Sequence, residues 1–378
     1  MKKIIKFISG KLFITSVLIL MQIVAYFMMF YHISRYSPYI YGIMTFLSIF
    51  FAFKTEIGDL QSDFKAIWIF FLISVPIFSW IIYIIIRKKK ITDKKRELLK
   101  SIDETIAVPK DISLLNQIND ENVKKQINYI VSTTEHNVYN RTTSKFFPMG
   151  KCFFESLEET LKKAEKFIFL EYFIINKGNV WNRIFNILKN KAKNGVEIRI
   201  LYDDIGTINL LPYGFRKKLK KYSIESAKFN PLAPYPDISI NCRDHRKIAV
   251  IDGKYAYTGG INIADEYSNE KERFGIWKDY GIFIEGKAVN EMTVMFLKIW
   301  GYSVGKKEEN FDKYLCDYHS VNDGLVIPFG ADPSRKENTV KNVYLNMISS
   351  AKKYIYITTP YLIPDSETLS AIKLASKS

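Results

Sequence analysis

A histidine and a lysine that stand two residues apart begin the pattern in this chain that is most able to do chemistry. The pattern is H-x-K-x4-D followed by a glycine pair and an asparagine, and its members are His245, Lys247, Asp252, Gly259, Gly260 and Asn262. An imidazole can attack phosphorus, while ammonium and amide groups stabilise charge that develops on phosphate oxygens. A lone H-x-K on a surface strand is the ordinary alternative, but the complete spacing favours a phosphodiester site.

Each member of the pattern has an expected role. His245 is the candidate nucleophile, and Lys247 is expected to neutralise a phosphate oxygen beside it. A nucleophilic histidine needs an acceptor for its second ring nitrogen, and Asp279 is the candidate. Asn262 is expected to donate to another phosphate oxygen, and the two glycines allow close approach of the backbone. Asp252 belongs to the pattern, but we expect it to brace the turn rather than to touch substrate.

The elements that must hold these residues indicate an α/β fold. His245 and Lys247 stand two residues apart and lead into the apolar run 248–251, which predicts a strand with His245 and Lys247 on one face. Residues 166–175 form a nearly continuous apolar run, typical of a strand buried on both faces. Residues 180–194 have helical spacing with Gly195 as the cap, and residues 196–202 predict the next strand. Strand, helix and strand together predict a βαβ unit.

Three stretches near the N-terminus contain no charged residue: residues 12–31, 36–53 and 66–86. A helix of about 20 apolar residues crosses a bilayer, so the first and third qualify clearly and the second is marginal. A signal peptide is the alternative for the first stretch, but its apolar run is too long and no cleavage site follows. Pro76 is expected to kink the third helix without ending it. The basic run at residues 87–90 places the following region in the cytoplasm.

The net charge of +16 is concentrated near these apolar stretches. Residues 1–100 hold 15 of the 55 lysines and arginines but 5 of the 39 acidic residues. A basic chain binds nucleic acid or an anionic membrane, and this distribution favours the membrane. The three cysteines and four histidines show no metal-ligand spacing, so we expect no metal site.

An internal repeat is visible in the second half of the chain. Residues 164–170 resemble residues 351–357, and each copy follows a helical stretch and leads into an aromatic-rich turn. Chance similarity between two apolar strands is the alternative. A repeat of this size predicts two similar domains. The place equivalent to His245 in the second copy falls beyond Ser378, so the H-x-K pattern occurs once here.

Several blocks extend beyond the reactive pattern. They are Phe167-Ile168-Phe169-Leu170-Glu171-Tyr172-Phe173-Ile174, Leu201-Tyr202-Asp203-Asp204-Ile205-Gly206, Phe229-Asn230-Pro231, Arg243-Asp244-His245-Arg246-Lys247, Gly259-Gly260-Ile261-Asn262-Ile263-Ala264-Asp265-Glu266-Tyr267, Trp277-Lys278-Asp279 and Thr358-Thr359-Pro360-Tyr361. Together they resemble the phospholipase D superfamily and, within it, the bacterial cardiolipin synthases, from about Phe64 to the last residue. Cys242 departs from the pattern, because the family usually has an aromatic residue there.

The resemblance implies a reaction as well as a fold. In this reaction a histidine attacks phosphatidylglycerol, a phosphatidyl-histidine forms, and a second phosphatidylglycerol displaces it to give cardiolipin and glycerol, without metal or cofactor. His245 would be the nucleophile, Lys247 and Asn262 would bind phosphate, and Asp279 would orient His245. The family's second H-x-K motif, which would protonate the departing glycerol, is absent from these residues.

The expected organisation has four parts. Residues 1–90 form a membrane anchor of two or three transmembrane helices, 91–145 a polar linker with short helices, 146–320 a first phospholipase D-like α/β domain, and 321–378 the start of a second, similar domain. The expected partners are phosphatidylglycerol and anionic lipid, with no nucleic acid and with a homodimer as an option. Two alternatives stay open: a phosphodiesterase or nuclease that uses one motif per chain in a dimer, and a membrane protein that binds anionic lipid without catalysis.

Overall fold

The computed structural model describes residues 11–31, 37–58, 62–87, 93–106, 113–232, 242–273, 275–321, 324–331 and 337–377. The chain divides into two compact units. One unit contains Met1–Lys90, Ala233–Asn241 and Ala351–Ser378, and the other contains Ile91–Leu232 and Cys242–Ser350. The basic residues at 2–6 and 88–90, on which part of the expected membrane orientation depends, lie outside the described residues.

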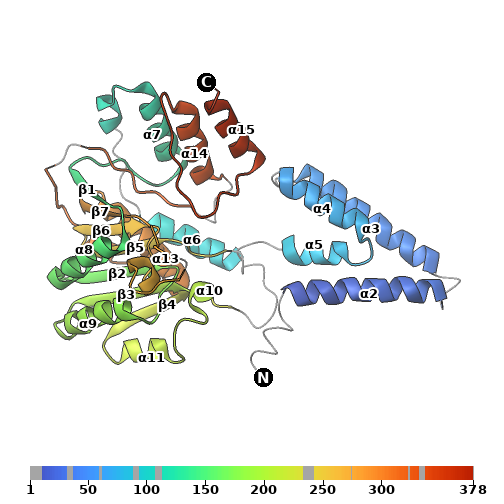
Figure 1. Ribbon diagram of the computed structural model, residues 1–378, viewed down its shortest axis with the longest axis horizontal. Coiled ribbons are helices and arrows are strands. Elements are labelled where there is room, and N and C mark those ends of the chain that lie inside the picture. The colour runs from blue at the N-terminus through green and yellow to red at the C-terminus, as the bar shows by residue number, and fades with distance from the viewer. Residues whose placement is uncertain are drawn as a thin grey trace. The chain divides into compact units, whose positions relative to one another are not determined.

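The second unit is built on a seven-stranded mixed sheet with the order β1-β7-β6-β5-β2-β3-β4 (Figure 1). The strands are β1 (Thr142–Phe147), β2 (Phe167–Tyr172), β3 (Glu197–Asp203), β4 (Ile224–Phe229), β5 (Lys247–Ile251), β6 (Tyr255–Gly259) and β7 (Gly281–Gly286). Strands β2, β3 and β4 run parallel, and the remaining neighbours are antiparallel. The predicted strand–helix–strand unit is confirmed as β2, α9 (Asn179–Lys193) and β3, and Gly195 follows α9 with φ +86°.

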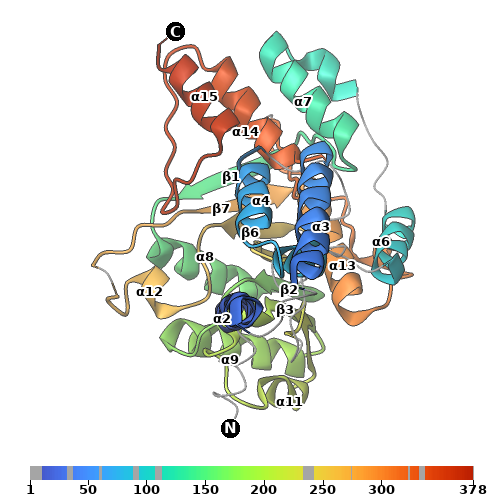
Figure 2. The same ribbon diagram turned by 90° about the vertical axis from the view of Figure 1, so that its right-hand side faces the viewer.

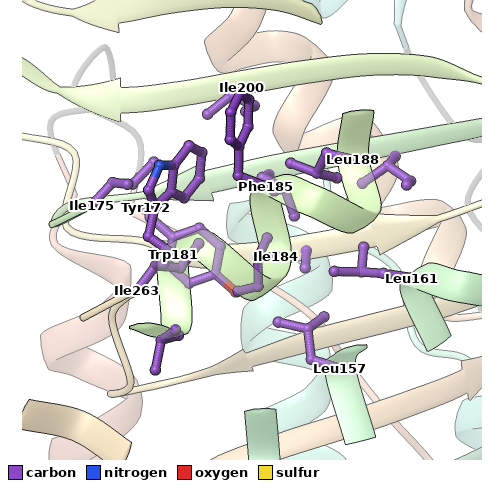
Figure 3. Packing of buried hydrophobic residues seen from close by; sticks show 14 of the residues in the cluster. Leu157, Leu161, Tyr172, Ile175, Trp181, Ile184, Phe185, Leu188, Ile200 and Ile263 are labelled. Carbon is purple, nitrogen blue, oxygen red and sulfur yellow. The ribbon is translucent and has the colours of Figure 1, made fainter. Parts of the chain in front are cut away.

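One face of the sheet is covered by α8 (Gly150–Lys163) and α9, whose apolar sides form a single core with the strands. Figure 3 shows Leu157, Ile184 and Leu188 of these helices packed with Tyr172 and Ile200 of the sheet. Every residue of β2 is buried, which explains its nearly continuous apolar sequence. Two short helices, α10 (Asp204–Thr207) and α11 (Phe215–Lys220), connect β3 to β4.

The other face is covered by α13 (Val289–Val304), which is buried along most of its length. Helix α6 (Asp93–Thr105) packs on the same core through Leu99 and Ile102. The segment 91–145, interpreted from sequence as a polar linker with short helices, therefore contributes a helix to the core of this unit. Its other helical elements are η1 (Ser113–Gln117) and α7 (Glu121–Thr133), while α12 (Asp265–Ser268), η3 (Phe311–Tyr314) and α14 (Thr339–Ser350) complete the unit. Figure 2 shows α7 and α14 next to each other, and Tyr129 of α7 accepts a hydrogen bond from Asn342 Nδ2 at 2.7 Å.

The apolar N-terminal stretches form four helices, α2 (Lys11–Tyr31), α3 (Ser37–Ile57), α4 (Ser62–Ser74) and α5 (Ser79–Arg87). Among the described residues, one helix has the length and composition of a membrane span, at Pro38–Ile57, with a mean hydropathy of 1.4. The shorter apolar helices are Ser16–Met28 and Phe64–Ser74. The stretch predicted to be marginal thus contributes a helix that qualifies as a span.

The expectation that Pro76 would only kink a continuous helix is wrong. Helix α4 ends at Ser74 and α5 begins at Ser79, because proline lacks an N–H group and its ring displaces the preceding carbonyl. Without a proline N–H, the Leu72 carbonyl loses its helical partner and accepts from the Ser79 hydroxyl at 3.3 Å instead. The hydroxyl of Ser48 in α3 donates to the Pro76 carbonyl at 2.8 Å and lies 3.1 Å from the Ser79 hydroxyl. The apolar stretch 66–86 is therefore two short helices joined at a break whose carbonyl is satisfied by α3.

The second copy of the repeat is only partly confirmed. Helices α14 and α15 (Ser366–Ala375) lie where the repeat predicts helices, but no strand forms within residues 351–365. The rings of Tyr354 and Tyr356 stack on each other with centroids 4.9 Å apart and are exposed. A strand requires a neighbouring backbone to satisfy its N–H and C=O groups, and the described residues supply none here.

Candidate active site

One edge of the sheet gathers nearly all of the predicted site residues. The parallel strands β2 and β3 end there, and the antiparallel strand β5 begins there, since Lys247 pairs with Tyr172. Strand β6 ends and β7 begins at the same edge, where Gly259 pairs with Gly281. The carboxyl ends of parallel strands are the usual location of ligands in open α/β sheets, so this edge is the candidate active site.

His245 and Lys247 contact each other directly. The Lys247 ammonium lies 3.2 Å from His245 Nδ1 and donates to the His245 carbonyl at 2.6 Å. The histidine side chain is open to solvent, whereas Lys247 is buried. The ring of Phe173 packs against the imidazole at 4.6 Å and lies 5.6 Å below the ammonium. The imidazole of His245 and the ammonium of Lys247, which were predicted to share a face, therefore meet beside the ring of Phe173.

The charges of the pair suit nucleophilic attack. Partial burial lowers the pKa of His245 below its ordinary value, and the Lys247 charge lowers it further. The imidazole is therefore neutral at neutral pH. Burial also lowers the pKa of Lys247 to about 8, against the opposing attraction of Asp244 and Asp279. The lysine thus keeps its proton at neutral pH and loses it on mild alkalinisation.

Asp279 faces this pair across the glycine turn. Its Oδ1 accepts the N–H of Tyr280 at 2.8 Å, and burial raises its pKa. A Cβ atom on Gly260 would lie 2.1 Å from that same oxygen, and a Cβ on Gly259, at φ +144°, would lie 2.4 Å from the Tyr280 carbonyl. Both glycines are thus required for the close approach of β6 to the segment that carries Asp279. The atom beside His245 Nδ1 is the Lys247 ammonium, not the Asp279 carboxylate.

Asn262 is tied into the protein by both ends of its amide. Its Oδ1 accepts the N–H of Ile174 at 3.0 Å, and its Nδ2 donates to the Tyr267 hydroxyl at 2.8 Å. The side chain is 2 % exposed. One N–H of the amide is left by these bonds for a phosphate oxygen, so the predicted contact is compatible with this position. The bond to Ile174 also joins the loop after β6 to the loop after β2.

Asp252 lies at the opposite end of β5 from His245. Its carboxylate accepts the N–H groups of Glu165, Lys166 and Phe167 at 2.8 to 2.9 Å, and it occupies the left-handed region with φ +55°. Because β5 separates it from the pair, the structure does not bring Asp252 into the site. Its position agrees with the expectation that it braces the turn, and not with its membership of the reactive group.

Three residues beside the pair have no role in the sequence-based prediction. They are Phe173, Asp203 and Asp244. Asp203 caps α10 by accepting from Ile205 N at 2.8 Å, and it also accepts from Asp244 N at 3.1 Å. It therefore fixes the residue that precedes His245. The position of Asp203 at the end of a strand was a usable signal, because such positions carry functional side chains in α/β sheets.

Comparison with known proteins gives a consistent result. Residues 157–300 match the family model described as "Cardiolipin synthase, PLD-like domain". A cardiolipin synthase from Listeria monocytogenes is 32% identical over 354 residues, which cover 90% of this chain and 73% of that protein. A cardiolipin synthase from Staphylococcus aureus is 33% identical over 344 residues, covering 87% and 69%. The matched region of β2 to α13 contains the whole candidate site.

Another relative carries no functional name. It is an uncharacterised protein from Streptococcus mutans, 45% identical over 242 residues, which cover 64% of this chain and 52% of that protein. The chain therefore spans about half of the length of this relative. Among solved structures, phosphatidylserine synthase from Haemophilus influenzae aligns with 62% of this chain and 59% of that chain, with a TM-score of 0.45 and 15% identity.

Proposed function

Because the chain belongs to the cardiolipin synthase family, with its phospholipase D-like domain, we propose that it is a phosphatidyltransferase that joins two phosphatidylglycerol molecules into cardiolipin and glycerol. The substrate is carried over from the names of the relatives. The single observation from the site that supports the proposal is the pairing of a neutral, solvent-open imidazole with a buried ammonium at 3.2 Å. Such a pair offers a nucleophile and a phosphate-binding cation at one point.

In the first step a nitrogen of His245 attacks the phosphorus of phosphatidylglycerol. The P–N bond forms as the bond between phosphorus and the glycerol oxygen breaks, and the departing oxygen takes a proton. Lys247 and the amide of Asn262 stabilise the charge on the phosphate oxygens, which is greatest in the transition state. The product is a phosphatidyl-histidine and free glycerol.

Before substrate binds, the hydrogen bond to Lys247 determines which ring nitrogen of His245 carries the proton. An ammonium only donates, so His245 Nδ1 accepts from Lys247 and the proton of the neutral imidazole is on Nε2. For Nε2 to attack, Lys247 must turn to the incoming phosphate and the proton must move to Nδ1. We propose that Asp279 then accepts that N–H, since it lies within electrostatic reach of Lys247 across the glycine turn.

In the second step the hydroxyl of another phosphatidylglycerol attacks phosphorus, the P–N bond breaks, and a base takes the hydroxyl proton. The acid of the first step and the base of the second require another group. Within the described residues, the side chains that contact His245 are those of Phe173 and Lys247, and neither His136 nor His319 is among them. We propose a second H-x-K motif for this role, carried by a further stretch of chain or by a second copy.

The membrane is the proposed location of this reaction. The apolar helix Pro38–Ile57 supports attachment to a bilayer, and the lysines and arginine at 87–90 support a cytoplasmic position of the following residues. A substrate with two acyl chains is presented at that surface. We propose that the anionic headgroup reaches His245 and Lys247 from the lipid side.

The covalent half-reaction provides a direct test. Vesicles would contain a phosphatidyl ester of nitrophenol, whose leaving group departs as an anion and needs no general acid. We expect release of nitrophenol together with a phosphatidyl adduct on His245, located by mass spectrometry of peptides. His245→Ala should abolish both signals, and His319→Ala, which alters a histidine outside the site, is the matched control.

Three outcomes would contradict the proposal. An adduct on a residue other than His245 would remove it as the nucleophile. Cleavage of DNA with no reaction of the lipid ester would favour the nuclease alternative. Binding of anionic vesicles with no adduct, unchanged by His245→Ala, would favour the non-catalytic alternative. With phosphatidylglycerol as substrate, cardiolipin and glycerol should form in equal amounts once the second motif is supplied.

A further inference from the structure

Arg246 lies between His245 and Lys247 in sequence but belongs to the other face of β5. Side chains alternate along a strand, and Ile248 and Val250 belong to the core beneath α13, whereas Ala249 belongs to the core beneath α8 and α9. Arg246 is therefore on the same face as Ile248 and Val250, the face that α13 covers. Its Nη2 donates to the Ala331 carbonyl at 2.8 Å, and its backbone N–H donates to Asp244 Oδ1 at 3.2 Å.

The nearest carboxylate does not satisfy this guanidinium. Glu171 Oε1 lies 3.9 Å from Arg246 Nη1, beyond hydrogen-bonding distance. Glu171 is fully buried, and its side-chain hydrogen-bond partner is the Asp244 carboxyl rather than Arg246. Burial, together with the neighbouring Asp244 carboxyl, raises the pKa of Glu171 well above its usual range, against the attraction of Arg246. The hydrogen bond to Ala331 is therefore the directional contact that fixes the guanidinium.

Ala331 belongs to the segment of residues 324–331, which is hydrogen-bonded to other parts of the second unit. Val326 exchanges two backbone hydrogen bonds with Tyr139, at 2.8 and 2.9 Å. Gly330 donates to His136 Nε2 at 3.4 Å, and the other nitrogen of that ring contacts Glu291 at 2.7 Å. The segment is thus anchored at Val326 and Gly330, which precede the residue that Arg246 contacts.

Gly330 leaves almost no space around the guanidinium. A Cβ atom at this position would lie 3.1 Å from Arg246 Nη2 and 2.9 Å from the terminal methyl of Met295. A side chain at position 330 would therefore press on the guanidinium and on Met295. Since residues 244–246 precede β5 and have no strand partner of their own, their backbone depends on Asp203 at Asp244 and on Arg246.

We propose that Arg246 is a positioning residue that couples the seating of segment 324–331 to the orientation of His245. The segment opens the part of the chain that the sequence interprets as the start of a second, similar domain. Arg246 would then link that part to the nucleophile, and a displaced segment would misalign His245. The inference rests on the proposed function for its kinetic consequence, but its geometric consequence can be measured without phosphatidyl transfer.

The kinetic test compares Arg246→Met with the wild-type protein in the nitrophenyl ester assay. We expect kcat to fall about tenfold or more while KM changes less than about twofold, because a misplaced nucleophile slows attack without weakening phosphate binding by Lys247. Gly330→Ala should cause a smaller fall in kcat by crowding the guanidinium. Tyr129→Phe, which removes a contact between α7 and α14 that does not involve Arg246, is the matched control.

A double-mutant cycle separates coupling from general damage. If Gly330→Ala acts through Arg246, it should have little further effect in the Arg246→Met background, whereas independent effects would multiply. Multiplying effects, or Arg246→Met activity within about twofold of wild type, would overturn the inference. If Arg246→Met fails to fold, Gly330→Ala must still lower kcat by more than Tyr129→Phe does.

The geometric test uses the rate at which diethyl pyrocarbonate modifies each histidine of the full chain, resolved by mass spectrometry. Arg246→Met and Gly330→Ala should change the rate at His245 about threefold or more and leave His319 unchanged, since a moved imidazole changes in exposure and pKa. An unchanged rate at His245 overturns the inference. A changed rate in a protein whose wild type forms no phosphatidyl adduct overturns the proposed function alone.

Discussion

The two ends of β5 carry members of one sequence motif but differ in how their charged groups are satisfied. At the end of the strand, the Asp252 carboxylate is buried and accepts three backbone N–H groups of the segment that enters β2. At the start, the His245 ring is open to solvent, and the buried Lys247 ammonium is held by that ring and by the His245 carbonyl. The Asp252 carboxylate thus has all its partners within the protein, whereas His245 and Lys247 can exchange their mutual contact for a contact with a ligand.

This difference separates holding the sheet from doing chemistry. A carboxylate with three short bonds to the backbone is fixed in place and contributes to stability. An ammonium whose pKa is lowered to about 8 by burial gains a stronger partner when a phosphate binds. Four residues of β5 lie between Lys247 and Asp252, so the two functions can be altered separately.

The largest expected effects come from substituting one residue at each end of β5 and measuring both activity and stability. His245→Ala should abolish adduct formation and change Tm little, because the side chain is exposed. Asp252→Ala should lower stability by about 3 kcal/mol, through three unsatisfied N–H groups and a left-handed φ that alanine disfavours. For a unit of this size the fall in Tm is about 6–12 °C. Tm by circular dichroism and adduct formation at low temperature are the two measurements.

Asp252→Asn is the control for the second variant. Asparagine tolerates the left-handed conformation, so only the charge and part of the hydrogen bonding are lost. We expect a fall in Tm between those of wild type and Asp252→Ala, with adduct formation kept in the folded protein. A folded Asp252 variant with normal Tm and no adduct would place Asp252 in the chemistry and end the contrast between the two strand ends.

The next largest effect concerns the lysine at the start of the strand. Lys247→Met should slow adduct formation about 10²-fold, the magnitude found for loss of one group that stabilises an oxyanion. In the wild type the rate should rise with pH as His245 loses its proton, at a pKa below the usual 6.5, and fall again as Lys247 is deprotonated near pH 8.

Lys247→Arg sharpens this prediction, since a guanidinium keeps its proton throughout the range. The fall in rate near pH 8 should disappear even though the rate itself is lower. Initial rates of nitrophenol release from about pH 5 to about pH 10 provide the measurement. If the alkaline fall persists in Lys247→Arg, the group that titrates there is not Lys247.

The fold could be predicted where hydrophobic pattern and turn chemistry agree. The run 166–175, the helix ending at Gly195 and the following strand are all confirmed, because burial on both faces and a left-handed cap leave clear signals. The break at Pro76 was misjudged, since its cost depends on whether side chains such as Ser79 and Ser48 satisfy the carbonyls of Leu72 and Pro76. The pairing of residues 351–357 was not predictable either, because a strand depends on a partner that local sequence does not specify.

The candidate site shows a similar division. Spacing alone placed His245 and Lys247 on one face, and the expectation that Asp252 braces a turn separated it from substrate. The support beneath them was missed, because Phe173 and Asp203 come from strands distant in sequence and meet His245 only in the folded sheet. Which group faces His245 Nδ1 depends on distances between side chains, and the sequence favoured Asp279 where the structure has Lys247.

The smallest expected effect tests whether Asp279 belongs with the reactive end of β5. Gly260→Ala places a methyl group 2.1 Å from Asp279 Oδ1, so the carboxylate or the turn must move. We expect kcat for nitrophenol release to fall about tenfold, since displacement of an orienting group misaligns the imidazole without removing it. In an Asp279→Ala background the same methyl group meets no carboxylate and should cost less than about twofold. Equal costs in the two backgrounds would mean that the glycine serves the backbone of the turn, and that Asp279, like Asp252, belongs to the scaffold.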